Sequence, residues 1–83
     1  MNHSDQVRKY CLESYITPAR NLGNKTISIR AGDIHKEMNF KNRLPLVCSA
    51  IGTQTFEEMA NVERISITGP TNGANTIFAF TLK

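Results

Sequence analysis

The side chains that could carry out catalysis or bind a metal are few and are scattered along the 83-residue chain. His3 and His35 have no cysteine or acid nearby at the spacing of a metal site. Glu57 and Glu58 lie at the expected start of a helix, where acids are common, and Glu63 stands apart. No serine or cysteine lies in a nucleophile-elbow context, and a chain of this size offers little concave volume for a substrate. We therefore expect no enzymatic activity, no metal and no other cofactor.

Basic residues, by contrast, are concentrated in one window. Residues 20–43 carry a net charge of +4 within a chain whose net charge is +3, so the remainder sums to −1. Local clustering of this kind favours a polyanionic partner, although a solvated basic face would give the same pattern. The basic residues of the window are Arg20, Lys25, Arg30, Lys36, Lys41 and Arg43.

Composition places these residues in one ordinary globular domain. Hydrophobic residues make up 40% and charged residues 20% of the chain, and we expect a single domain over residues 1–83 with residues 1–4 frayed. No apolar run approaches the roughly 20 residues of a membrane span, and the N-terminus lacks the pattern of a secretory signal. The only cysteines, Cys11 and Cys48, are expected to be buried free thiols. These features together favour the cytoplasm and exclude a membrane partner.

The N-terminal third of the chain predicts a helix. Apolar residues recur there at steps of three and four residues. Ser4 or Asp5 can cap the start of this helix, and Gly23 can end it. Pro18 interrupts the pattern, either as a kink or as the start of a new turn that Thr17 caps.

The basic window itself predicts a strand followed by a short helix. Thr26 to Arg30 alternates polar and apolar residues and is rich in β-branched side chains, which indicates a strand. Residues 31–38 then indicate a helix in which Ile34 and Met38 share one face. Asn39 is suited to end this helix in the left-handed conformation.

A third helix and a hairpin complete the pattern. Asn42 can cap the third helix, Pro45 is tolerated only in its first turn, and Gly52 can end it. Residues 55–59 indicate one further helical turn. Residues 62–68 and 76–82 are strand candidates joined by the turn-rich loop 69–75. The apolar positions that define the third helix are Phe40, Leu44, Val47, Cys48 and Ile51.

This order of elements resembles the winged helix-turn-helix family over about residues 5 to 82. The most telling stretch runs from Thr26 to Ile51: a strand, Ala-Gly-Asp-Ile at a helix start, Met38-Asn39-Phe40 at the turn and an amphipathic helix. The resemblance implies an α+β fold with three helices, a short strand and a C-terminal β-hairpin, the wing. It also implies that Phe40 plugs the core. We expect Ile34, Phe40, Val47, Ile51 and Phe78 to be buried together.

The resemblance further implies that the third helix enters the major groove of duplex DNA while the wing reaches the backbone or minor groove. With the apolar residues inward, Asn42, Arg43, Leu46, Ser49 and Thr53 face outward. Arg43 suits guanine, Asn42 suits adenine, and Leu46 suits either a thymine methyl group or a protein partner. The remaining expected contacts are Arg30, Lys36 and Lys41 to phosphates, and Thr71, Asn72 and Asn75 from the wing.

The sequence thus predicts a DNA-binding domain of a small transcriptional regulator or of a targeting subunit. We expect it to act as a homodimer through the first helix, near Tyr10 and Tyr15. The alternative is a protein–protein interaction winged helix within a larger complex, docking through the hairpin edge or Leu46. RNA binding is a weaker alternative, since Phe78 and Phe80 share a strand face that the core is expected to use.

Overall fold

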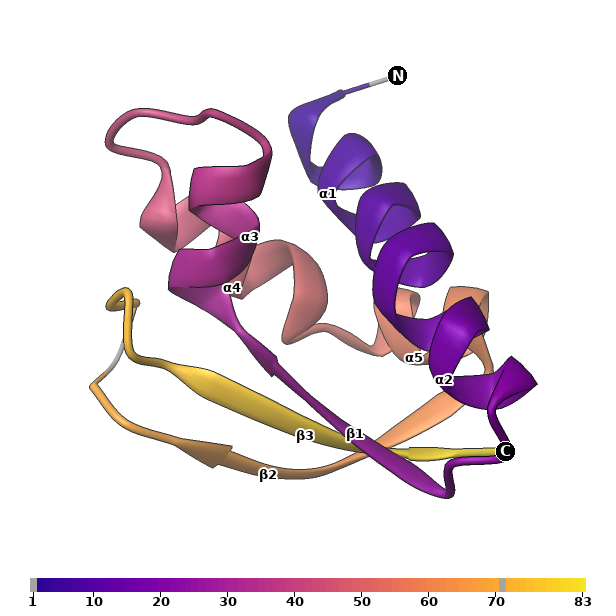
Figure 1. The fold of residues 1–83 in the computed structure, drawn as a ribbon. Helices are drawn as coiled ribbons and strands as arrows, with labels where there is room; N and C mark the ends of the chain where they lie inside the picture. Colours follow the sequence, from indigo (N-terminus) through magenta and orange to yellow (C-terminus); the bar gives the residue numbers. More distant parts are fainter. Residues whose placement is uncertain (1, 71) are drawn as a thin grey trace.

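A three-stranded antiparallel sheet carries the helices on one of its faces (Figure 1). This computed structural model describes residues 2–70 and 72–83. The chain forms helices first, then one strand, then more helices, then a hairpin, so the expected α+β class is confirmed. In order, the elements are α1 (His3–Cys11), η1 (Leu12–Ile16), α2 (Thr17–Asn21), β1 (Thr26–Arg30), α3 (Ala31–Glu37), α4 (Leu44–Ile51), α5 (Gln54–Ala60), β2 (Val62–Thr68) and β3 (Ile77–Leu82).

The first helix begins earlier than expected. Asn2 is its cap, because its backbone is extended and its Oδ1 accepts the Asp5 N–H at 2.8 Å. Neither Ser4 nor Asp5 is the cap, since both already lie inside α1. A cap needs a side-chain oxygen three residues before a free N–H, and Asn2 satisfies this one turn earlier.

Pro18 is accommodated by a widened turn rather than by a new cap. The five residues of η1 form a π-helix, and Thr17 N–H bonds the Leu12 carbonyl five residues back. Thr17 has helical backbone angles, so the second of the two alternatives, a new turn that Thr17 caps, is not the one that forms. Pro18 follows directly within the same continuous helix, and the widened turn accommodates its ring, which in a regular α-helix would clash with the carbonyl four residues back. The helix ends as expected at Gly23, whose φ is +80°.

The strand and helix of the basic window form as expected. β1 occupies Thr26–Arg30, and α3 follows it directly. Ile34 is buried and Met38 packs against the core from the same face. Asn39 has φ 59°, which confirms the left-handed end of the helix.

The start of α4 differs from the sequence prediction. Asn42 has φ 55°, and its side chain does not cap the helix, because a cap residue requires an extended backbone. Arg43 occupies the cap position without a side-chain hydrogen bond. Pro45 lies in the first turn and Gly52 follows the last, as expected. The single turn expected near residue 55 is a full helix, α5, which Asn61 closes at φ 57°.

The strand order is β1-β3-β2, so β3 is central. Ile29 pairs with Phe78 and Ile27 with Phe80, which places these four side chains on the same face. The pairing of β2 with β3 shifts register between Arg64 and Ser66, at a β-bulge. β2 and β1 are the two edges of the sheet.

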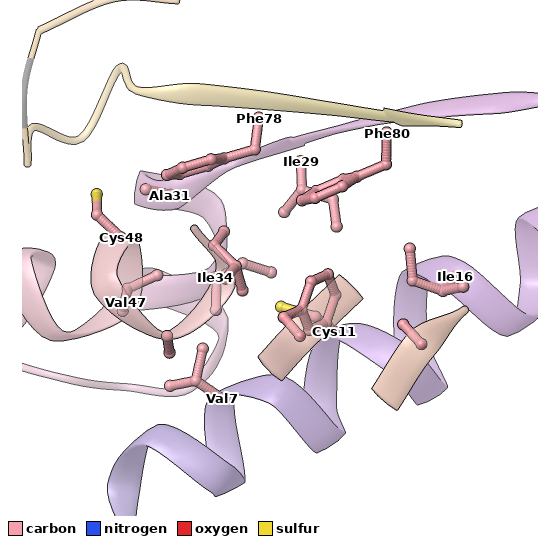
Figure 2. Close-up of a cluster of buried hydrophobic side chains, with 14 of the residues drawn as sticks. Val7, Cys11, Ile16, Ile29, Ala31, Ile34, Val47, Cys48, Phe78 and Phe80 are labelled. Atoms are coloured by element: carbon pink, nitrogen blue, oxygen red, sulfur yellow. The ribbon is translucent and has the colours of Figure 1, made fainter. Parts of the chain in front are cut away.

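The core fills the space between the sheet and the helices (Figure 2). Phe78, Phe80 and Ile29 project from the sheet toward Ile34 of α3 and Val47 of α4. The expected burial of Ile34, Val47, Ile51 and Phe78 is confirmed. Cys11 and Cys48 are both buried and free, also as expected.

Phe40 is the exception within the expected core. It is half-buried and packs against the margin of the cluster, because α4 begins only at Leu44 and leaves Phe40 in the preceding turn. Its ring lies 5.9 Å from that of His3 and 6.2 Å from that of His35, centroid to centroid. The aromatic centre of the core is instead formed by Phe56 and Phe80, whose rings meet edge to face at 5.4 Å. Over residues 2–70 and 72–83, no helix is long and apolar enough to cross a membrane.

Candidate nucleic-acid interface

His35 holds the turn between α3 and α4. Its carbonyl accepts the Phe40 N–H at 3.0 Å, its Nε2 accepts the Arg43 N–H at 3.1 Å, and its ring packs edge-on against Phe40. The side chain of His35 is half-buried under the turn. These contacts fix the backbone of Met38 to Arg43, and with it the positions of Lys41, Asn42 and Arg43.

Three cationic side chains project from this turn and its flanks. Lys36, Lys41 and Arg43 are exposed. Within the part of the chain that the structure describes, none of them forms an ion pair; the pairs found are Arg8–Asp5 and Arg30–Asp33. Asn42 lies between Lys41 and Arg43 and is exposed as well. The expected phosphate and base contacts of this segment are therefore brought together on one surface.

The other basic residues of the window serve different purposes. Arg20 donates from Nη2 to the carbonyls of Ala60 and Asn61, at 2.9 and 3.0 Å, and so binds the C-terminal end of α5. Lys25 lies between α2 and β1, at the opposite end of the molecule from the α3–α4 turn (Figure 1). The basic window of the sequence is thus not one continuous surface.

Arg30 is also committed to contacts within the chain. Its Nη1 is 2.8 Å from Asp33 Oδ1, and its Nη2 donates to Asn75 Oδ1 at 2.6 Å. Next to this pair, Gly32 N–H bonds the Ala74 carbonyl at 2.9 Å. Arg30 and Asn75 were both expected to contact DNA separately. In the structure they bind each other and hold the hairpin loop against the start of α3.

The hairpin loop closes on its own polar groups. Thr76 is buried, its Oγ1 accepts the Gly73 N–H at 3.0 Å, and its hydroxyl donates to the Pro70 carbonyl. Gly69 has φ +90°, a conformation that favours glycine. Asn72 is exposed at φ 55°, whereas the expected contact Thr71 lies outside the described residues.

The outward face of α4 is only partly free. Val47, Cys48 and Ile51 are buried and Leu44 packs against the core, so the expected helical phase is confirmed. Ser49 is exposed, and Leu46 is half-buried. Thr53 Oγ1 donates to the Ala50 carbonyl at 3.2 Å, which satisfies the hydroxyl at the end of the helix. Only Ser49 thus remains as a fully exposed polar side chain on this part of α4.

A groove of about 580 Å³ separates α4 from the β-hairpin. Its floor contains Ile67 and Phe78, and Ser49 and Asn72, both expected DNA contacts, stand on its sides. No charged side chain lines it among the described residues. Sequence reasoning missed this groove, although the two isoleucines of β2 in a strand with otherwise polar residues were the available signal.

A second depression, of about 360 Å³, lies at the other end of β2 and is acidic. Glu57, Glu58 and Glu63 line it, with Lys83 as the one basic residue. Glu57 Oε1 accepts the Arg64 backbone N–H at 2.9 Å. In residues 2–70 and 72–83, no group of three or more His, Cys, Asp or Glu residues is arranged to hold a metal ion.

The hydroxyls of Tyr10 and Tyr15 both bind the carboxylate of Glu37. Their hydroxyls donate to Glu37, at 2.6 Å from Tyr10 and 2.8 Å from Tyr15. The hydrogen bond to Glu37 raises the pKa of Tyr10, and burial with the same hydrogen bond raises the pKa of Tyr15. These tyrosines therefore link the N-terminal helix to α3, so their hydroxyls are already occupied at the surface expected for dimerisation.

Comparison of the chain with protein-family models, curated proteins and solved structures found no match. A function for the chain therefore has to be inferred from the geometry of its own residues. Of the ten polar or charged residues expected to contact DNA, the structure gathers four around one turn: Lys36, Lys41, Asn42 and Arg43. It places the others in the groove, in internal hydrogen bonds or outside the described residues.

Proposed function

We propose that the chain is a winged helix-turn-helix domain that binds duplex DNA through the α3–α4 turn and the first turn of α4. The order of elements supports the fold, because a strand, two helices joined by a short turn and a later hairpin follow one another as in that family. The strand β1 pairs with the second strand of the hairpin, which holds the helix pair and the hairpin in one unit.

The observation that carries the proposal is the set of three exposed cations, Lys36, Lys41 and Arg43, around one fixed turn. Arg43 also stands at the uncapped start of α4. The first N–H groups of a helix have no partner within it and favour an anion. Pro45 has no N–H and the Arg43 N–H is bonded to His35, so a phosphate at this point would meet the N–H groups of Leu44 and Leu46 and the side-chain charge of Arg43. Lys36 and Lys41 would contact phosphates, while Asn42 and Arg43 would contact base edges.

A fluorescence anisotropy titration of labelled random and selected duplexes at two salt concentrations tests this. Each neutralised phosphate contributes about −0.9 to the log–log slope of affinity against salt, so Lys36→Ala and Lys41→Ala should each reduce the slope by about one. Lys25→Ala is the matched control, because it removes the same charge at the other end of the molecule and should leave the slope unchanged. If the folded chain shows no association at low salt and tens of micromolar protein, DNA binding is excluded.

Dimerisation through the N-terminal helix would supply the second half-site that one short helix cannot. Leu22, at the end of α2, is 79% exposed, the highest value among the large hydrophobic residues that the structure describes. We propose that Leu22, rather than Tyr10 or Tyr15, lies at the centre of this contact. Sedimentation equilibrium should show self-association that Leu22→Ser weakens and Met59→Ser, a matched change at a hydrophobic residue exposed on α5, does not.

The alternative function, protein–protein interaction, is favoured by one specific observation. The groove between α4 and the hairpin has an apolar floor and no charged lining, which suits a protein side chain better than a phosphate. The two functions use different residues of the chain, so they are separable by substitution.

A further inference from the structure

β2 is an edge strand that is open toward its C-terminal end, because nearer its N-terminal end the Arg64 backbone N–H is bonded to Glu57 of α5. Of its seven residues only Val62 is buried. Ile65 is 55% and Ile67 is 49% exposed, although both are β-branched hydrophobic residues in a strand. Among the described residues, no strand pairs with the outer edge of β2. Edge strands are normally protected by charges or bulges, and here the bulge lies at the middle of the strand, between Arg64 and Ser66.

The two ends of β2 differ in chemistry. The end near Thr68 borders the apolar groove, whose floor is formed by Ile67 and Phe78. The end near Val62 borders the acidic depression that Glu57, Glu58 and Glu63 line. An extended segment running along β2 would therefore meet an apolar site at one end and a negatively charged site at the other.

We propose that the outer edge of β2 binds an extended segment of a partner protein, which adds to the sheet as a fourth strand. Main-chain hydrogen bonds supply affinity in this mode, and side chains of alternate residues supply specificity. The segment carries an apolar side chain that enters the groove beside Ile67 and a lysine or arginine that reaches the acidic depression beside Glu63.

The spacing and direction of these two side chains follow from the strand. Glu63 lies opposite Thr81 and Ile67 lies opposite Phe78, so the bulge between them places the two side chains on opposite faces of the sheet, about 10 Å apart along it. In an antiparallel pairing the segment presents its apolar residue first and its basic residue roughly three or five positions later, an odd spacing that points the two side chains to opposite faces. Because Arg64 N–H is already bonded to Glu57, we expect the new main-chain hydrogen bonds along residues 66–68.

Charge excludes the other occupants of this edge. Two copies of β2 related by a two-fold axis would run antiparallel, which would place the acidic end of each strand against the apolar end of the other. Duplex DNA would meet Glu57, Glu58 and Glu63 at one end of the strand. A basic and apolar peptide is the occupant whose chemistry matches both ends.

Selection of a phage-displayed library of random twelve-residue peptides on the full chain tests the proposal. We expect convergence on an apolar residue followed by a basic one. A labelled peptide of the selected sequence, titrated by fluorescence anisotropy, should bind Ile67→Thr at least about tenfold more weakly. Ile77→Thr is the matched control, because Ile77 is 36% exposed on the opposite face of the sheet and should bind normally.

Two further variants separate this site from the proposed DNA surface. Glu63→Gln should weaken the basic peptide several-fold, whereas Glu13→Gln, a matched change at an exposed acid of η1, should not. Arg43→Ala should leave peptide binding unchanged whether or not the chain binds DNA. Circular dichroism of each variant establishes that it is folded.

Three outcomes would overturn the proposal. The first is that no selected peptide binds the chain. The second is that bound peptides are insensitive to both Ile67→Thr and Glu63→Gln. The third is that sedimentation detects self-association lost in Ile67→Thr, which would assign the edge to a second copy of the chain.

Discussion

The α3–α4 turn and the β2–β3 loop both turn the chain through left-handed asparagines, Asn42 and Asn72, each at φ 55°. They use their polar groups in opposite ways. In the loop, the Thr76 hydroxyl forms hydrogen bonds with the backbone of Gly73 and Pro70. The side chain of Asn75, also in the loop, is bonded to Arg30. The turn is held from below by His35, which leaves the side chains of Lys41, Asn42 and Arg43 free. The polar side chains of a loop can thus bind a partner when a residue outside the loop, such as His35, holds the loop backbone in place.

The largest contrast in stability is expected between a phenylalanine of β3, the strand that follows the loop, and the phenylalanine of the α3–α4 turn. Phe80 of β3 is fully buried, so Phe80→Ala should lower the free energy of unfolding by about 3–5 kcal/mol. Phe40 of the turn is half-buried, and Phe40→Ala should cost about 1–2 kcal/mol because less apolar area is removed from contact. Urea unfolding followed by circular dichroism measures both. Equal losses would mean that Phe40 plugs the core after all.

Thr76→Val should cost about 1–3 kcal/mol of stability, because it leaves the Gly73 N–H and the Pro70 carbonyl of a part-buried loop without their partner. Valine keeps the shape of threonine, so the change isolates the hydroxyl. Thermal unfolding should show the loss while the salt dependence of DNA binding stays the same. A stable Thr76→Val variant would contradict the view that the loop depends on its own hydrogen bonds.

Asn42→Gly and Asn72→Gly form a matched pair of smaller effect. Glycine accepts a positive φ at both positions, so neither change should reduce stability by more than a few tenths of a kcal/mol. Asn42→Gly should weaken binding to a preferred duplex by about 1–3 kcal/mol, the typical contribution of an amide contact to adenine. Asn72→Gly should leave binding unchanged. The reverse result would move the DNA surface from the turn to the wing.

Cys11 should affect the pH dependence of the free energy of unfolding only above neutral pH. Burial raises the pKa of Cys11 to about 12, from the 9.0 of an exposed thiol. A group whose pKa is raised by folding stabilises the fold fully below its unfolded pKa. That contribution should therefore be lost as the pH rises from about 9 toward 12. Unfolding measured across this range should show a decline that Cys11→Ala reduces, and a flat profile in the wild type would refute the assignment.

Regular elements were predictable because their periodicity is local. The β1 and β2 bounds, the inward face of α4 and the left-handed Asn39 all follow from residue spacing and backbone preference. Helix starts were less predictable, since Asn2 and Asn42 are equally good cap residues in sequence. Only the backbone conformation decides that Asn2 caps a helix and Asn42 does not.

The candidate site was predictable only where its residues are neighbours in sequence. Lys41, Asn42 and Arg43 stay together because the turn is short. Arg30 and Asn75 are 45 positions apart, and their hydrogen bond depends on the pairing of β1 with β3. The same pairing of distant segments forms the groove between α4 and the hairpin. Contacts of this kind depend on tertiary packing, which local patterns do not encode.

The central position of β3 has a consequence for the order in which the chain folds. β1 has no strand partner until Ile77–Leu82 is available, and the paired residues are separated by 47 to 55 positions. Closing so long a loop costs more entropy than closing the adjacent β2–β3 hairpin. A nascent chain emerging from the ribosome can therefore form its helices first, while β1 stays unpaired until β3 has been synthesised. Until then β1 is an unpaired, aggregation-prone edge, and a chain cut before Ile77 would keep it so.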